Sequence, residues 1–260
     1  MSLLLSDLKS GALTLTLNRP ERANAFTLDL IRALLSALEQ AGRDSQVRVI
    51  VVTGAGRVFG AGQDIEEIKS YGDNLSYREH LLKTYNPLIL LIRQIEKPIL
   101  AAVNGPCAGA SLGLALACDI RLAAETANFV VGFNGIGLAP DSAVSLLLPA
   151  LIGLGRASEF TFTNAPISAH RAFEIGLVNR LHPADKLMAE TQKLAAQLAA
   201  GPVGAFGLTK RAFNRAALRN LEETLNYEAD LQEIAGKRFE HKEGVAAFLE
   251  KRKPHFEQTP

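Results

Sequence analysis

The chain has few cysteines and histidines, and it lacks the residue patterns typical of disulfide-bonded secreted proteins, metal sites and serine nucleophiles. It contains two cysteines, Cys107 and Cys118, five scattered histidines and no tryptophan in 260 residues. The cysteines lie among small or apolar residues and no histidine has ligand spacing, so we expect reduced cysteines, no bound metal and a cytoplasmic protein. Neither Ser111 nor Ser142 stands in a recognisable His/Asp pattern, which argues against a serine nucleophile.

An excess of charge of one sign is also missing. The chain has 28 Lys plus Arg against 27 Asp plus Glu, a formal net charge of +1. A nucleic-acid-binding protein usually carries a strong basic field, so no nucleic acid partner is expected. The N-terminal MSLLLSDLKS has no basic residue before its leucines, and no segment reaches the roughly 18 apolar residues of a membrane span. We therefore expect neither a secretory signal nor a membrane partner.

The hydrophobic pattern indicates strands and helices in alternation. Leucines alternate with threonines over 13–17, as in a strand, and Thr27 is a plausible N-cap for a helix that ends near Gly42. A β-branched run over 47–53 is typical of a strand buried on both faces. The pattern then predicts further elements, in order: a helix over 76–95, a strand over 99–103, a helix ending at 117, and strands over 119–123 and 128–131.

The C-terminal part has a different character. After Pro140 every segment is predicted to be helical, apart from a short strand-like stretch over 176–178. With 48% hydrophobic residues, a chain of this length can form one large core without disulfides or a metal. The fold class is therefore α/β with a helical C-terminal region.

Two glycine-rich segments follow buried strands. The first, GAGRVFG over 54–60, superficially resembles a dinucleotide-binding loop, but it lacks an acidic residue at the end of a second strand about 20 positions further on, so we expect a tight turn. The second, NGPCAGAS over 104–111, leads into an Ala/Leu helix. Unpaired N–H groups at a helix start suit an anion or a developing oxyanion, and close helix packing explains the small residues equally well.

Five segments, in their order and separation, resemble the enoyl-CoA hydratase/isomerase (crotonase) family: NRPERANAF, TGAGRVFGAGQDIEEI, AAVNGPCAGASLGLALACDIRLA, FVVGFNGIGLAPDSA and HKEGVAAFLEKRKPHF. The resemblance implies a crotonase-like spiral of ββα turns over residues 1–200 and a C-terminal helical trimerisation region over 201–260. It also implies a homotrimer or a dimer of trimers. The substrate would be an acyl-CoA thioester, with coenzyme A part of the substrate and no further cofactor.

The same resemblance implies an oxyanion hole formed by the backbone N–H groups of Gln63 and Ala110. Removing a proton beside a thioester places negative charge on the thioester oxygen, and each preorganised donor contributes about 3 kcal/mol there. The Gln63 side chain is then expected to be free to vary. Six residues are implied to line the coenzyme A groove: Arg22, Ala23, Ala25, Ala61, Asp64 and Ile65.

Some charged residues have two interpretations. Arg22 is either a phosphate ligand or an ordinary loop arginine. The basic run 251–253 is more simply a solvated surface than a contact to the coenzyme A of a neighbouring subunit. Asp64 and Asp119 lie in family motifs, where we expect structural hydrogen bonds more than proton transfer.

The chain departs from the hydratases of the family at their two glutamates. Gly113 and Phe133 occupy these positions, which disfavours addition of water through the usual pair, and Phe133 makes one wall of the acyl pocket apolar.

Asp141 is the remaining carboxylate. By itself, an Asp after Pro at a helix start is most simply an N-cap. The resemblance to dienoyl-CoA isomerases and to the ring-epoxide isomerases of phenylacetate breakdown implies that Asp141 is the catalytic acid and base.

One carboxylate suffices for isomerisation, because it can remove a proton from one carbon and return it to another. The resemblance therefore favours conversion of ring-1,2-epoxyphenylacetyl-CoA to the oxepin, a shift of the double bond in 3-enoyl-CoA to 2-enoyl-CoA, or both. The alternatives are a hydratase that holds water in another way and a non-catalytic acyl-CoA-binding protein. An apolar wall raises the pKa of Asp141 and a helix N-terminus lowers it, so the sequence leaves the balance open.

Overall fold

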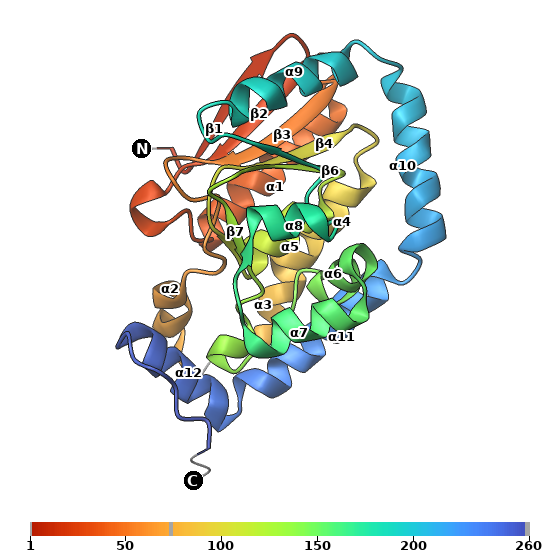
Figure 1. The fold of residues 1–260 in the computed structure, drawn as a ribbon. Coiled ribbons are helices and arrows are strands. Elements are labelled where there is room, and N and C mark those ends of the chain that lie inside the picture. The colour runs from red at the N-terminus through yellow and green to blue at the C-terminus, as the bar shows by residue number, and fades with distance from the viewer. Residues whose placement is uncertain (1, 73–74, 258–260) are drawn as a thin grey trace.

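The computed structural model describes residues 2–72 and 75–257, which form two β-sheets with helices packed around them (Figure 1). The larger sheet has six strands, in the spatial order β1 (Leu4–Lys9), β2 (Ala12–Leu17), β3 (Val49–Gly54), β4 (Ile99–Val103), β6 (Ile120–Ala124) and β9 (Arg180–His182). β1 pairs antiparallel with β2, and the other pairs are parallel. The smaller sheet contains β5 (Cys107–Ala108), β7 (Asn128–Val130) and β8 (Ile167–Ser168).

The chain winds as a spiral between these sheets. β4 of the larger sheet leads into β5 of the smaller one, and β6 leads into β7. After β3, Gly60 forms an isolated bridge with Cys107 and so reaches the same smaller sheet. The turns that begin with β4 and β6 thus contribute one strand to each sheet, and the turn that begins with β3 adds a single bridge, which is the spiral expected from the sequence.

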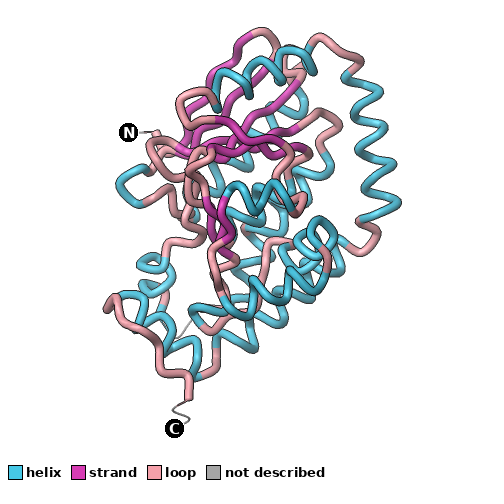
Figure 2. Tube along the Cα trace, viewed as in Figure 1, coloured by secondary structure: helices cyan, strands magenta, loops and turns pink. Residues whose placement is uncertain are grey.

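Helices surround the sheets: Figure 2 shows the strands in the upper and central part of the view, with helices above, beside and below them. Two short 3-10 turns lie at Pro20–Arg22 (η1) and Asn134–Ile136 (η3). The helices are α1 (Leu28–Arg43), α2 (Ile65–Ser70), α3 (Tyr77–Lys83), α4 (Tyr85–Gln94), α5 (Ala110–Ala117), α6 (Val144–Ile152), α7 (Leu154–Thr163), α8 (Ala169–Glu174), α9 (Leu187–Ala199), α10 (Val203–Ala217), α11 (Leu221–Gly236) and α12 (Phe239–Leu249).

Burial on both faces explains the apolar central strands. Every residue of β3 and β4 is buried, because α1 covers one side of the larger sheet and α9 packs on the other. In α1 the buried residues Leu30, Leu34 and Leu38 recur at helical spacing. The Thr27 hydroxyl accepts a hydrogen bond of 3.3 Å from the N–H of Leu30, which confirms the predicted N-cap.

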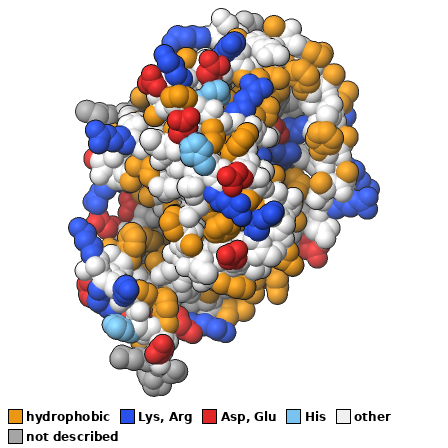
Figure 3. Space-filling view, viewed as in Figure 1, with side chains coloured by type: hydrophobic (Ala, Val, Ile, Leu, Met, Phe, Trp, Pro, Cys, Tyr) orange, Lys and Arg blue, Asp and Glu red, His pale blue; other side chains and the backbone are white. Residues whose placement is uncertain are grey.

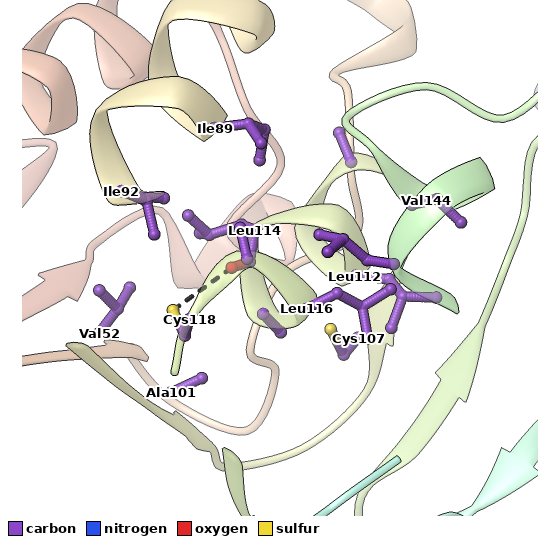
Figure 4. Close-up of a cluster of buried hydrophobic side chains, with 14 of the residues drawn as sticks. Val52, Ile89, Ile92, Ala101, Cys107, Leu112, Leu114, Leu116, Cys118 and Val144 are labelled. Atoms are coloured by element: carbon purple, nitrogen blue, oxygen red, sulfur yellow. Dashed lines mark hydrogen bonds between the residues drawn. The ribbon is translucent and has the colours of Figure 1, made fainter. Parts of the chain in front are cut away.

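Both cysteines belong to the core. Figure 4 shows Cys107 and Cys118 among buried aliphatic side chains, and neither forms a disulfide. The thiol of Cys118 donates to the carbonyl of Leu114 at 3.3 Å. Burial raises the pKa of Cys118 to about 12 and that of Cys107 well above its usual value, so both are protonated at neutral pH.

Several elements differ from the sequence-based expectation. The single helix predicted over 76–95 is two helices, α3 and α4, because the ring of Pro87 cannot lie beside the carbonyl of Lys83 in a continuous helix. The predicted strand over 176–178 is a buried turn in which Leu177 and Val178 both donate to the carbonyl of Ala172, and strand β9 begins after it. Strands β1, β5, β8 and β9 were not predicted, and the expectation that every segment after Pro140 is helical is wrong at β8 and β9, which are two and three residues long and too short to leave a β-branched run.

The C-terminal helices do not stand apart from the spiral. α11 packs against α3, α4 and α6, and it contacts α12, which in turn packs on η3. The division of the chain at residue 200 remains a prediction. Within residues 2–72 and 75–257, no helix combines the length and the hydrophobicity of a membrane span.

Candidate active site

A cavity of about 630 Å³ lies where the start of α5, the helices α2 to α4 and the C-terminal helices α11 and α12 meet. All of the site residues predicted from the sequence line it, although they come from distant parts of the chain: Arg22, Ala23, Ala25, Ala61, Gln63, Asp64, Ile65, Ala110, Phe133 and Asp141. The basic run 251–253 does not line it, whereas Phe248 and Leu249 of α12 do.

Asp141 is a buried carboxylate in the wall of this cavity, with 7% of its surface exposed. Its Oδ1 accepts a hydrogen bond of 2.7 Å from the Ser142 hydroxyl, and its Oδ2 accepts one of 2.8 Å from Nε2 of Gln232. Burial raises the pKa of Asp141 to about 6, although both hydrogen bonds act in the opposite direction. The carboxyl group can therefore both gain and lose a proton near neutral pH.

Asp141 does not cap the following helix, so the N-cap interpretation is wrong. α6 begins at Val144, after two consecutive residues in the left-handed region, Ser142 at φ 56° and Ala143 at φ 61°. This conformation costs about 1–2 kcal/mol per residue outside glycine. The turn sends the Asp141 side chain into the cavity instead of toward the N–H groups of α6.

The N–H groups at the start of α6 are capped from another helix. The carboxylate of Glu228, on α11, accepts hydrogen bonds from the N–H groups of Ala143 at 2.8 Å and Ser145 at 3.0 Å, and also from the Ser145 hydroxyl. Glu228 is 2% exposed, and burial raises its pKa to about 7, with the charge of Asp141 acting in the same direction.

Two backbone N–H groups, those of Gln63 and Ala110, belong to neighbouring segments of the cavity wall. A Cβ on Gly62, which has φ +86°, would lie 3.3 Å from the backbone nitrogen of Ala110, so the segment that carries Gln63 runs directly beside the start of α5. Among residues 2–72 and 75–257, no acceptor is found for the N–H of Gln63 or of Ala110. Both groups belong to cavity-lining residues and remain available as donors.

The side chain of Gln63 is not free to vary, contrary to expectation. Its Oε1 accepts hydrogen bonds from the Tyr85 hydroxyl at 2.6 Å and from Nε2 of His80 at 3.1 Å. Its Nε2 donates to the carbonyl of Phe26 at 3.0 Å and to Glu67 at 3.3 Å. This network fixes the peptide on which the candidate oxyanion donor sits.

The two positions that carry glutamates in hydratases of the family cannot supply a carboxylate here. Gly113 lies in the buried helix α5, and a Cβ on it would lie 2.4 Å from the Cβ of Ser142. The loop that presents Asp141 thus occupies the space that a side chain at Gly113 would need. Phe133 is 6% exposed and gives the cavity an aromatic wall.

Comparison with known proteins agrees with this geometry. The model of the family described as enoyl-CoA hydratase/isomerase matches residues 7–259. The chain belongs to the enoyl-CoA hydratase/isomerase family. It is 39% identical, over 98% of both chains, to the 1,2-epoxyphenylacetyl-CoA isomerase of Escherichia coli (strain K12).

Solved structures of the family are also similar. An enoyl-CoA hydratase from Mycobacterium avium subsp. paratuberculosis is 37% identical, with a TM-score of 0.89 over 98% of this chain and 99% of that one. An enoyl-CoA hydratase/isomerase from Pseudoalteromonas atlantica is 34% identical, with a TM-score of 0.88 over 98% and 100%. The relatives thus carry both isomerase and hydratase names.

The charged residues at the outer end of the cavity are mostly paired within the chain. Arg22 is half exposed and forms a 2.6 Å ion pair with Glu66. Asp64 caps α2, accepting from the N–H groups of Glu66 and Glu67, and forms a 3.0 Å ion pair with Arg19. Asp64 therefore has the structural hydrogen bonds expected of it.

The other charged positions have structural partners. Asp119 binds the N–H of Ile99 and the side chains of Arg93 and Lys210. In the basic run 251–253, Arg252 is bound to Glu243 at 2.5 Å. Arg252 thus has a carboxylate partner within its own chain.

The glycine loop over 54–60 is a turn, as expected. A Cβ on Gly54 would lie 2.2 Å from the carbonyl oxygen of Val58, and a Cβ on Gly105 would lie 1.9 Å from that of Arg57. The next helix, α2, begins only at Ile65. The described part of the chain contains no group of three or more His, Cys, Asp or Glu side chains that could hold a metal ion.

Sequence reasoning missed several polar residues of the cavity. Glu228 and Gln232 lie four positions apart on α11, on the same buried face as Leu221 and Leu225. A charged residue at helical spacing from buried leucines is the one sequence signal that could have identified them. The hydroxyl of Tyr77 binds Nε2 of His241 at 2.6 Å, a contact between α3 and α12 that only the fold creates.

Proposed function

We propose that this family member is an acyl-CoA isomerase in which Asp141 moves the proton and the N–H groups of Gln63 and Ala110 stabilise the oxyanion. The observation that carries the proposal is the buried Asp141 carboxylate in the cavity wall, with a pKa of about 6. Gly113 and Phe133, at the glutamate positions of hydratases, support isomerisation over hydration. An acid with a pKa near the working pH is suited to both removing and returning a proton.

For a 3-enoyl-CoA the steps balance with one carboxylate. Asp141 removes a proton from carbon 2, and the electron pair of that C–H bond delocalises over the double bond and the thioester carbonyl. The N–H groups of Gln63 and Ala110 donate to the oxygen that becomes negative. The protonated Asp141 then returns the proton to carbon 4, which gives the 2-enoyl-CoA.

The second substrate that we propose is ring-1,2-epoxyphenylacetyl-CoA, with the oxepin as the product. The similarity to the E. coli 1,2-epoxyphenylacetyl-CoA isomerase supports this choice. The aromatic wall at Phe133 also suits a ring-bearing acyl group. This rearrangement keeps all atoms of the substrate, so it needs no water and no cofactor beyond the coenzyme A of the substrate.

The coenzyme A portion is proposed to lie along the outer part of the cavity. Arg22, Ala23 and Ala25 of the η1 loop and Ala61, Asp64 and Ile65 before α2 line this part. Alanines there leave room for the pantetheine, and Arg22 is the charge that a phosphate would meet in competition with Glu66. Replacing Arg22 with Ala should weaken CoA-ester binding and leave kcat little changed.

The protein is proposed to act in the cytoplasm as a homotrimer or a dimer of trimers. Free, buried cysteines are usual for a cytoplasmic protein. Figure 3 shows hydrophobic side chains along the right-hand edge, where Figure 1 places α10, and elsewhere on this face charges of both signs are interspersed. Phe162, Phe213 and Tyr227 are each at least 62% exposed. Light scattering after size exclusion tests the assembly.

The activity is tested with purified protein against a 3-enoyl-CoA, a 2-enoyl-CoA and ring-1,2-epoxyphenylacetyl-CoA, following products by mass and ultraviolet absorbance. We expect isomeric products of unchanged mass, and loss of turnover in Asp141→Asn by a factor of about 10²–10⁴ with CoA-ester binding retained. A product heavier by one water would identify a hydratase. Binding without turnover in either form would identify a non-catalytic protein.

A further inference from the structure

The Asp141 loop is held by two side chains of a single helix. Glu228 accepts from the N–H groups of Ala143 and Ser145. Four residues later, Gln232 donates to Oδ2 of Asp141 at 2.8 Å and to the carbonyl of Ala139 at 2.8 Å. Residues i and i+4 lie on one face of a helix, so α11 presents both side chains to the segment 139–145.

The chemistry of the acceptors fixes the orientation of the Gln232 amide. A carbonyl oxygen accepts only, so Nε2 must face Ala139, and the same nitrogen then faces the Asp141 carboxylate. Gln232 is 1% exposed, and Glu228 is 2% exposed. Both side chains are therefore almost completely shielded from bulk water.

The left-handed turn at Ser142 and Ala143 makes these bonds necessary. Two adjacent non-glycine residues in this region persist only where the surroundings enforce them. Glu228 binds the N–H of Ala143 itself, and no local side chain caps α6. If the turn relaxed, the Asp141 side chain would leave the cavity wall.

We propose that Glu228 and Gln232 are positioning residues for Asp141: Glu228 holds the strained backbone turn, and Gln232 holds the carboxylate and favours its ionised form. This inference rests on the proposed function, because it assigns to α11 the task of aiming the proposed acid and base. It makes α11 part of the reaction machinery and not only a packing element.

Gln232→Met tests the second half of the proposal, since Met fills a similar volume and lacks the donor. A hydrogen bond to a charged group corresponds to about one pH unit, so the titration of Asp141 should move up by about that amount. Two measurements follow the titration of Asp141: the acid limb of the plot of kcat against pH, and the carboxyl infrared band that is assigned to Asp141 because Asp141→Asn removes it. The other groups that face Asp141 are Tyr85 from α4, Glu228 from α11 and the adjacent Ser142, and all are unchanged.

Glu228→Gln tests the first half, because one amide cannot accept from both N–H groups. We expect kcat to fall by about tenfold or more with KM little changed. Adding Ala143→Gly should restore part of kcat, because glycine adopts the left-handed conformation without help. Gln192→Met is the matched control: Gln192 lies on α9, and the change removes its 2.7 Å hydrogen bond to Thr14 on β2, so it should leave both readouts unchanged.

The outcomes separate the inference from the proposed function. If Asp141→Asn keeps isomerase activity, the proposed function is wrong, and the infrared titration still decides the role of Gln232. If the Asp141 band titrates identically in wild type and Gln232→Met, or if Ala143→Gly fails to rescue a folded Glu228→Gln, the positioning role is refuted. Circular dichroism spectra establish that each variant is folded.

Discussion

Asp141→Asn should stabilise the protein at neutral pH while it abolishes turnover. Burial raises the pKa of Asp141 from 3.8 to about 6, so the folded state favours the protonated form. The stabilisation from this preference is complete below the unfolded pKa and is lost as the pH rises through the folded one. A shift of about two units at 1.36 kcal/mol each amounts to about 3 kcal/mol, which the wild type loses between about pH 4 and pH 6.

Asparagine avoids this loss and fits the same hydrogen bonds. Its amide oxygen can accept from Gln232, and its amide nitrogen can donate to the Ser142 hydroxyl, which both donates and accepts. The free energy of unfolding of the variant should therefore exceed that of the wild type by up to about 3 kcal/mol above pH 6, with the difference shrinking toward pH 4.

Urea unfolding followed by circular dichroism measures this difference. Both proteins are compared at one protomer concentration, because assembly shifts the apparent stability. Asp185→Asn, at a carboxylate whose side chain is 76% exposed, is the matched control for the same change of residue type on the surface. Equal pH dependence for wild type and Asp141→Asn would refute the claim that this carboxyl group is buried with a raised pKa.

Three further predictions follow from the same geometry. The isomerase kcat should fall about tenfold per pH unit below about pH 6, as Asp141 becomes protonated, and a stopped or continuous absorbance assay across pH checks this. Gly113→Glu should lower the melting temperature and confer no hydratase activity, because the new Cβ would meet Ser142 at 2.4 Å; a stable, hydrating variant would contradict it. Gly62→Ala should reduce both kcat and thermal stability, because Gly62 has φ +86° and the added Cβ would lie 3.3 Å from the backbone nitrogen of Ala110. Steady-state kinetics and thermal melts check this.

The sequence determined much of the fold because its signals are local. The apolar runs of β3 and β4, the Thr27 cap and the periodic leucines of α1 depend on residues close in the chain, and the structure has these elements where they were predicted. The strand expected at 176–178 failed because apolar residues in a buried turn look like a short strand. Ordered motifs across the chain also indicated the family, which the comparisons show.

For the candidate active site, the sequence determined less than it did for the fold. The resemblance to the family, and not a local signal, indicated Gln63, Ala110 and Asp141 as site residues. Only the tertiary structure decided that Asp141 is not a cap and that the Gln63 side chain is held by its neighbours. It also decided that α11 supplies Glu228 to the strained turn. Contacts between segments about 85 residues apart leave no periodic trace in the sequence, since each depends on where the whole chain brings its helices together.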